Sequence, residues 1–183
     1  MRNEAKWKWM MAVGSAVLGA TFWVGIARAT PASGFSGTTI ALGHLESFAV
    51  RNRVDLSGST GEEAGDDDER SFWLSVQRTR GSSDLYVQNN VWAPGGTTGW
   101  HSHPGHSLIV VTDGAVTAYE GDATTCTPHL YTAGMAFVDH GGTHVHMLRN
   151  EGAVPAKTIA VQMVPAGATR RIDAAGPPGC SGL

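Results

Sequence analysis

The stretch Trp100-His101-Ser102-His103-Pro104-Gly105-His106 decides how the rest of this sequence is interpreted. It places three histidines within six residues, and seven of the chain's eight histidines lie between positions 101 and 146. Imidazole is the commonest protein ligand for transition metals, so this crowding indicates chelation rather than packing. His101 and His103 are two residues apart, which puts both side chains on one face of an extended strand.

A second pair of histidines with the same spacing, His144 and His146, lies further along the chain. A strand that carries this pair beside the strand of His101 and His103 would supply a third nitrogen ligand to the same ion. The spacing alone leaves His144 and His146 as competing candidates for that third ligand.

Short apolar segments separated by turn residues predict an all-β domain. Residues 84–92 alternate between apolar and polar for much of their length, and residues 108–111 form a continuous apolar run typical of a buried strand. Turn sequences such as Asp113-Gly114 recur between these segments, and the 24 glycines fit the same plan. We therefore expect one β-barrel or β-sandwich. Further strand-like segments cover residues 39–54, 72–78, 115–119, 135–138, 145–149 and 158–164.

The glycines and histidines of residues 84–164 resemble the two sequence motifs of the cupin superfamily. The first motif is matched by Gly95, His101-x-His103 and Gly114, and the second by Gly134, Gly142, His146 and Asn150. Cupins are jelly-roll β-barrels that hold a divalent metal with three histidines and usually one glutamate. The resemblance implies a single-domain cupin jelly-roll barrel with His101, His103 and His146 as metal ligands.

Two positions depart from the family pattern. Ser107 stands where the family has its glutamate, and His140 stands where it has a proline. One extra residue between His140 and His146 keeps His144 in competition, whereas the intact spacing to Asn150 favours His146. Three neutral imidazoles leave the +2 charge of the metal uncompensated and keep positions open for water, substrate or dioxygen.

The N-terminus has the pattern of an export signal. Arg2, Lys6 and Lys8 precede an apolar run at residues 10–26, and Ala27-Arg28-Ala29 offers small residues at a cleavage site. Residues 1–29 are therefore predicted to be a signal peptide, with an uncleaved anchor as the alternative. The mature protein is expected outside the cytoplasm, at the cell envelope, in a periplasm or in the extracellular medium.

The two cysteines, Cys126 and Cys180, both lie in the part of the chain that is predicted to be exported. An even, widely spaced pair in an oxidising compartment predicts a disulfide. This bond would tie the C-terminal tail, residues 167–183, to the predicted barrel of residues 72–166. Residues 30–71 then form an N-terminal extension with early strands and an acidic loop, and its first residues, 30–38, are expected to be flexible.

Charge narrows the choice of partners. Without residues 1–29, which carry four basic and one acidic side chain, the chain has 9 basic and 15 acidic residues and a formal net charge of −6. Nucleic acids and anionic membranes require clustered positive charge, so neither is expected as a partner beyond the N-terminal signal.

The predicted function is that of an exported barrel with a divalent transition metal: iron, manganese, nickel, copper or zinc. The resemblance implies a small-molecule oxygenase, and a module that binds a metal or small ligand without turnover is the alternative. A small-molecule ligand is expected in either case, and a homodimer is compatible with the sequence. No catalytic residue is assigned.

Overall fold

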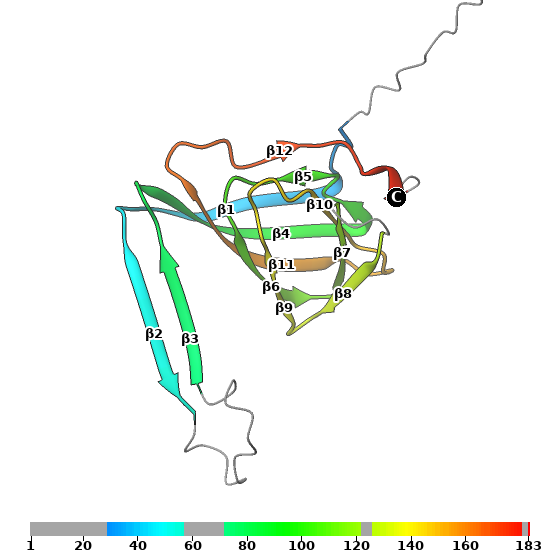
Figure 1. Ribbon diagram of the computed structural model, residues 1–183. Helices are drawn as coiled ribbons and strands as arrows, with labels where there is room; N and C mark the ends of the chain where they lie inside the picture. Colours follow the sequence, from blue (N-terminus) through cyan, green and yellow to red (C-terminus); the bar gives the residue numbers. More distant parts are fainter. Residues whose placement is uncertain (1–28, 57–71, 122–125, 181–182) are drawn as a thin grey trace, which may run out of the picture.

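The computed structural model describes residues 29–56, 72–121, 126–180 and 183, and these residues form an all-β fold (Figure 1). The predicted signal peptide, apart from Ala29, and the predicted acidic loop at residues 57–70 lie outside the described residues. Among the residues described, no helix is long and apolar enough to cross a membrane. The barrel strands belong to one continuous ten-stranded sheet that folds into a nearly closed antiparallel barrel. Its two halves are called the first and the second sheet below.

The first sheet is organised around the long strand β4, which has a neighbour on each side. Pairing follows the order β1 (Ser33–Leu45), β4 (Ser83–Thr97), β11 (Ala156–Pro165), β6 (Ser107–Asp113) and β9 (Ala136–Asp139).

The second sheet contains the histidine pairs. Its order is β12 (Ile172–Asp173), β5 (His101–Ser102), β10 (His146–Arg149), β7 (Ala115–Glu120) and β8 (Pro128–Thr132). The two sheets join where Arg149 of β10 pairs with Thr97 of β4.

The core lies between the two sheets, because each strand turns every second side chain inward. Its largest buried member is Trp92, and the buried set comprises Trp92, Ile109, Val111, Val116, Ala118, Leu148, Ala156 and Ala160. The prediction that residues 108–111 are buried throughout is wrong. Ile109 and Val111 are buried, but Leu108 and Val110 are 53% and 44% exposed, because β6 shows one face to the core and the other to solvent.

The structure also differs from the prediction at the N-terminal side. Residues 33–38 were expected to be flexible, but they belong to β1, which pairs along β4. The apolar contact behind this pairing is Phe35 on Trp92, whose ring centroids are 4.9 Å apart. The barrel therefore begins within the predicted extension, because hydrogen bonding to the edge of β4 stabilises a strand that has little apolar pattern of its own.

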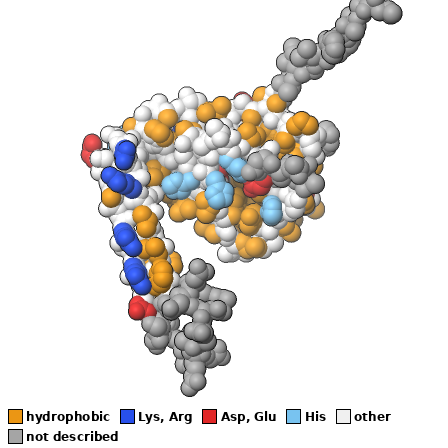
Figure 2. All heavy atoms as spheres, in the orientation of Figure 1, with side chains coloured by type: hydrophobic (Ala, Val, Ile, Leu, Met, Phe, Trp, Pro, Cys, Tyr) orange, Lys and Arg blue, Asp and Glu red, His pale blue; other side chains and the backbone are white. Residues whose placement is uncertain are grey.

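A separate ribbon of two strands, β2 (Ala49–Asp55) and β3 (Phe72–Arg78), stands off the barrel (Figure 1). Basic side chains follow one edge of it, beside hydrophobic ones (Figure 2), and Trp73 and Val76 are at least half exposed. β3 was predicted to open the barrel, but its strand partner is β2, so residues 72–78 are not part of the barrel wall.

The C-terminal tail packs against the barrel. β12 pairs with β5, and the 3-10 helix Pro178–Cys180 follows it. Cys180 forms a disulfide with Cys126, with their Cα atoms 5.2 Å apart, and it is buried in a second cluster with Trp100, Tyr119 and Met147. The tail is thus covalently fixed beside the strand that carries His101.

Removing the disulfide should destabilise the barrel. For a closed loop with a sequence separation of 54 residues, chain entropy predicts a loss of about 4 kcal/mol in the free energy of unfolding. We expect a Cys126→Ala/Cys180→Ala variant to show this loss in denaturant unfolding, and reductant to have no further effect on it. Equal stability of the variant and the oxidised parent would contradict the assigned role of the bond.

Candidate metal centre

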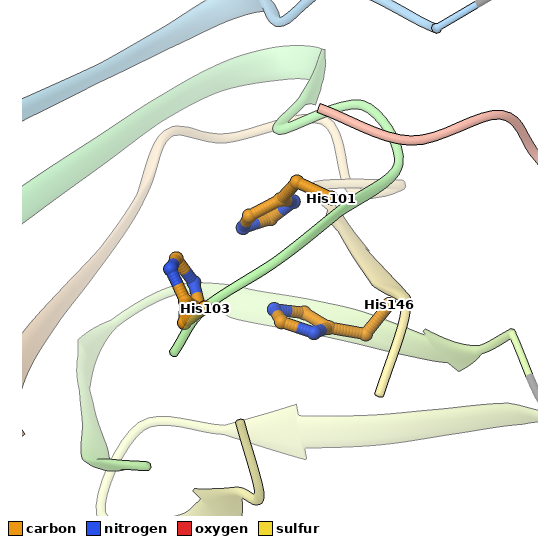
Figure 3. Close-up of side chains that lie close together, drawn as sticks. All are labelled: His101, His103 and His146. Atoms are coloured by element: carbon orange, nitrogen blue, oxygen red, sulfur yellow. The ribbon is translucent and has the colours of Figure 1, made fainter. Parts of the chain in front are cut away.

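Three histidine side chains converge inside the barrel. His101 in β5 lies directly opposite His146 in β10, and His103 follows immediately after β5. Figure 3 shows the three rings turned toward one another from these two segments. Their centroids are 4.4–5.3 Å apart, and one nitrogen from each ring lies within 4.8 Å of the others. Nitrogens at these separations fit around one transition-metal ion after small adjustments, since each metal–nitrogen bond is about 2.0–2.2 Å.

The turn that leads into His101 requires glycine at position 99. Its φ is +65°, a conformation that L-residues with side chains rarely adopt, and a Cβ atom there would lie 1.9 Å from the carbonyl oxygen of Thr30. This tight turn brings the carbonyl oxygen of Gly99 to 2.9 Å from Nδ1 of His101.

Backbone carbonyls set the tautomers of two of the histidines. Nδ1–H of His101 donates to the oxygen of Gly99, and Nδ1–H of His103 donates to the oxygen of Arg170 at 2.5 Å. A carbonyl oxygen only accepts hydrogen bonds, so the proton of each neutral ring is assigned to Nδ1. The two Nε2 atoms are left as lone-pair donors for a metal.

Burial keeps these imidazoles neutral. It lowers the pKa of His101 to about 2, with the charges of His146 and His103 acting in the same direction. Burial also lowers the pKa of His146 to about 4, against the opposing effect of Asp139, and it lowers the pKa of His103. All three rings therefore offer lone pairs at neutral pH, as metal ligation requires.

His144, the competing third ligand, lies in a different group. Its Nε2 is 3.0 Å from Oε2 of Glu120, and its possible ligand atoms cluster with those of Asp139 and His146. The described residues thus contain two candidate groups that share His146. The predicted trio of His101, His103 and His146 comes together, whereas His144 does not join His101 and His103.

Asp139 is the residue that the sequence analysis missed. It is 6% exposed at the end of β9, where it pairs with Ser107 of β6, the position at which the family glutamate was sought. Its Oδ2 lies 3.4 Å from Nε2 of His103, and its Oδ1 lies 3.5 Å from Nδ1 of His146. The only available clue was an aspartate inside the second motif, directly before His140, and nothing in the sequence shows that β9 lies beside β6.

Asn150 has a structural role next to the site. Its side-chain amide donates to the carbonyl oxygens of Val154 at 2.7 Å and Ala93 at 3.2 Å, and its Oδ1 accepts from the backbone N–H of Gly152 at 3.0 Å. These bonds fix the turn after β10 to the end of β4. The second-motif asparagine therefore holds the strand that carries His146.

The histidines open into a cavity of about 280 Å³. The lining includes apolar residues, among them Phe35, Trp92 and Ile109, which we call the apolar wall. It also includes polar residues, among them Gln162, Arg170 and Arg171, which we call the polar wall, and its two arginines are the basic wall. Nε of Arg170 donates to Oε1 of Gln162 at 3.0 Å. The guanidinium carbon of Arg170 also lies 4.0 Å from the ring centroid of Tyr86. The cavity joins a metal-binding arrangement to a basic wall.

The comparison with known families agrees with this architecture: residues 91–162 match the family described as Cupin domain. Among solved structures, one from a study of the mechanism of oxalate oxidase is 22% identical, with a TM-score of 0.39, over 45% of this chain and 46% of that chain. A cupin superfamily protein from Desulfitobacterium hafniense is 11% identical, with a TM-score of 0.38, over 44% of this chain and 67% of that chain.

A cupin domain from Bordetella pertussis is 20% identical, with a TM-score of 0.38, over 43% of this chain and 80% of that chain. The match thus spans about half the length of the oxalate oxidase structure, and similarities at this level do not extend to activity. No curated protein matches the sequence.

Replacing Asn150 with alanine should destabilise the fold. The change leaves buried carbonyl oxygens without donors, and each unsatisfied group costs about 1–3 kcal/mol. We expect a loss of about 2–4 kcal/mol in the free energy of unfolding, measured with denaturant. Asn52→Ala on the exposed ribbon is the matched control and should change stability by less than about 0.5 kcal/mol. Similar values for the two variants would contradict this role.

Proposed function

We propose that this chain, which contains a cupin domain, binds one divalent transition metal through His101, His103 and His146 and acts with it on a small molecule in the barrel. The buried three-histidine cluster supports this proposal most directly. In His101 and His103 the proton is on Nδ1, which donates to a backbone carbonyl oxygen, so Nε2 of each ring carries a lone pair. A cation stabilises lone pairs that converge in this way.

The donor set favours iron, manganese, nickel, copper or zinc. Imidazole nitrogen suits these ions, whereas calcium and magnesium prefer oxygen ligands. Such an ion supplies Lewis-acid chemistry and, for the redox-active metals, one-electron chemistry with dioxygen. The residues of the chain hold it, exclude bulk water through the apolar wall and orient the ligand through the polar wall.

The size and charge of the cavity favour a small anion as the ligand. Its volume of about 280 Å³ corresponds to roughly nine water molecules at about 30 Å³ each. Arg170 and Arg171 line it. Arg171 is ion-paired with Asp173 at 2.6 Å, so the proposal rests on Arg170, since guanidinium is the side-chain group best matched to a carboxylate. We therefore propose a small organic acid as substrate or ligand.

Turnover separates the two functions that the site supports. An oxygenase should consume dioxygen when the metal-loaded protein is given its substrate, whereas a binding module should bind the same acid without oxygen uptake. The basic wall and the open cavity serve both, and the oxygenase is favoured because three protein ligands leave coordination positions open. The disulfide between Cys126 and Cys180 agrees with an oxidising compartment, and export stays a prediction.

The metal site is tested by single alanine substitutions. We expect His101→Ala, His103→Ala and His146→Ala each to weaken Co²⁺ or Mn²⁺ binding at least 100-fold in calorimetric titration, because each removes one of three ligands. His144→Ala and His106→Ala are the controls and should retain binding within about threefold, since neither belongs to the converging trio. A folded parent protein that binds no metal, or strong loss of binding in His144→Ala alone, would contradict the proposal.

The anion preference is tested at Arg170. We expect Arg170→Met to weaken binding of malonate to the metal-loaded protein by about tenfold or more, since a hydrogen bond to a charged group contributes about 1.5–3 kcal/mol. Binding of the neutral malonamide should change little, and Arg53→Met on the ribbon should change neither affinity. If the parent protein prefers the neutral compound, the assignment of an acidic ligand is wrong.

A further inference from the structure

We propose that Asp139 is the anionic partner of the metal centre: a positioning residue that orients His146 and offsets part of the charge of the cation. This inference rests on the proposed metal site. The carboxylate of Asp139 comes from β9, where it pairs with Ser107 of β6. This strand therefore supplies the negative charge that the segment carrying His101 and His103 lacks.

Asp139 is buried with few partners of its own. Its oxygens accept two hydrogen bonds, from the hydroxyl of Ser107 at 3.2 Å and from the backbone N–H of Gly141 at 3.1 Å. Within the described part of the chain, its ion-pair neighbours are His103 and His146, and neither Lys nor Arg pairs with it. Burying a carboxylate without a cation is unfavourable, so this environment calls for a positive charge close by.

The contact between Asp139 and His103 indicates where the positive charge would lie. Nδ1–H of His103 is already engaged by the carbonyl oxygen of Arg170, so the Nε2 atom that faces Oδ2 of Asp139 at 3.4 Å carries a lone pair. Two acceptors that face each other without a shared proton repel. A cation beside His103 Nε2 turns this repulsion into attraction for both groups.

The contact with His146 explains the positioning role. Oδ1 of Asp139 lies 3.5 Å from Nδ1 of His146, which is a buried atom, and the ring of His146 also hydrogen-bonds to the backbone of His144. A closer approach of a few tenths of an ångström makes Nδ1 the protonated nitrogen and leaves Nε2 to face the metal. A carboxylate on the far nitrogen of a metal-binding histidine fixes the ring and raises its basicity.

Asp139 is not one of the proposed metal ligands. The three histidine nitrogens lie within 4.8 Å of one another, and Asp139 falls instead into the group with His144 and His146. Its effect is therefore assigned to charge and to the orientation of His146 rather than to a bond with the metal.

The test measures Co²⁺ affinity and absorption in the intact protein. We expect Asp139→Asn, which keeps the shape and removes the charge, to weaken Co²⁺ binding 10–100-fold, while the visible bands of bound Co²⁺ keep their positions because the ligands are unchanged. Asp113→Asn is the matched control on an exposed carboxylate at the end of β6 and should shift affinity less than twofold.

A rescue variant separates charge from a purely structural role. Adding Ser107→Glu to Asp139→Asn returns one carboxylate to the paired position on β6, and we expect affinity to recover to within about threefold of the parent. Circular dichroism checks that each variant folds, and the double variant still tests the inference if Asp139→Asn alone does not fold.

The outcomes distinguish this inference from the proposed function. If the folded parent binds no Co²⁺, the metal site itself fails. If the parent binds and Asp139→Asn binds equally well, or the double variant recovers nothing, the role of Asp139 is overturned while the three-histidine site stands. A change in the visible bands of Asp139→Asn would place Asp139 among the ligands and overturn the positioning role.

Discussion

The pairing of β5 with β10 is the constraint on which the candidate site depends. It sets His101 opposite His146, and a slip of one residue would turn one of these side chains to the other face of the sheet. β5 is only two residues long, but it is held on both sides, by β10 and by β12. The disulfide at Cys180 fixes the tail that follows β12, so the register beside the histidines is supported covalently.

The chemistry of the cavity follows from the direction of its hydrogen bonds. Protons on His101 and His103 point outward to backbone carbonyl oxygens, so lone pairs point inward. Asp139 adds a negative charge to the same space. Acceptors thus converge on this side of the cavity, which Arg170 and Arg171 also line. The proposed cation between the histidines would make these acceptors compatible with one another.

Strong alternation made much of the barrel predictable from the sequence. The segment of β4 carries it over residues 84–92, β6 was recognised instead from a continuous apolar run, and the resemblance to the cupin motifs supplied the arrangement of the strands. β1 was not foreseen over residues 33–38, because that segment is small and polar and its strand forms through hydrogen bonds to β4. β3 has a strand pattern as clear as any, but pattern does not say which strand it pairs with, and it pairs with β2.

The candidate site, like the fold, was predictable only where the information is local in the sequence. Spacing of two residues brings His101 and His103 to one face, and this is local information. Asp139 could not be found in this way, because its place beside His103 depends on the register between β6 and β9, which are far apart in sequence. The search for a carboxylate at Ser107 looked along the histidine segment, whereas the structure offers one from the neighbouring strand.

The most direct test of the account is anomalous X-ray diffraction from crystals grown with Co²⁺ and measured at the cobalt absorption edge. The account predicts one strong peak about 2.0–2.2 Å from a nitrogen of each of His101, His103 and His146. A peak centred instead between Asp139 and His144, or no peak within the barrel, would contradict it.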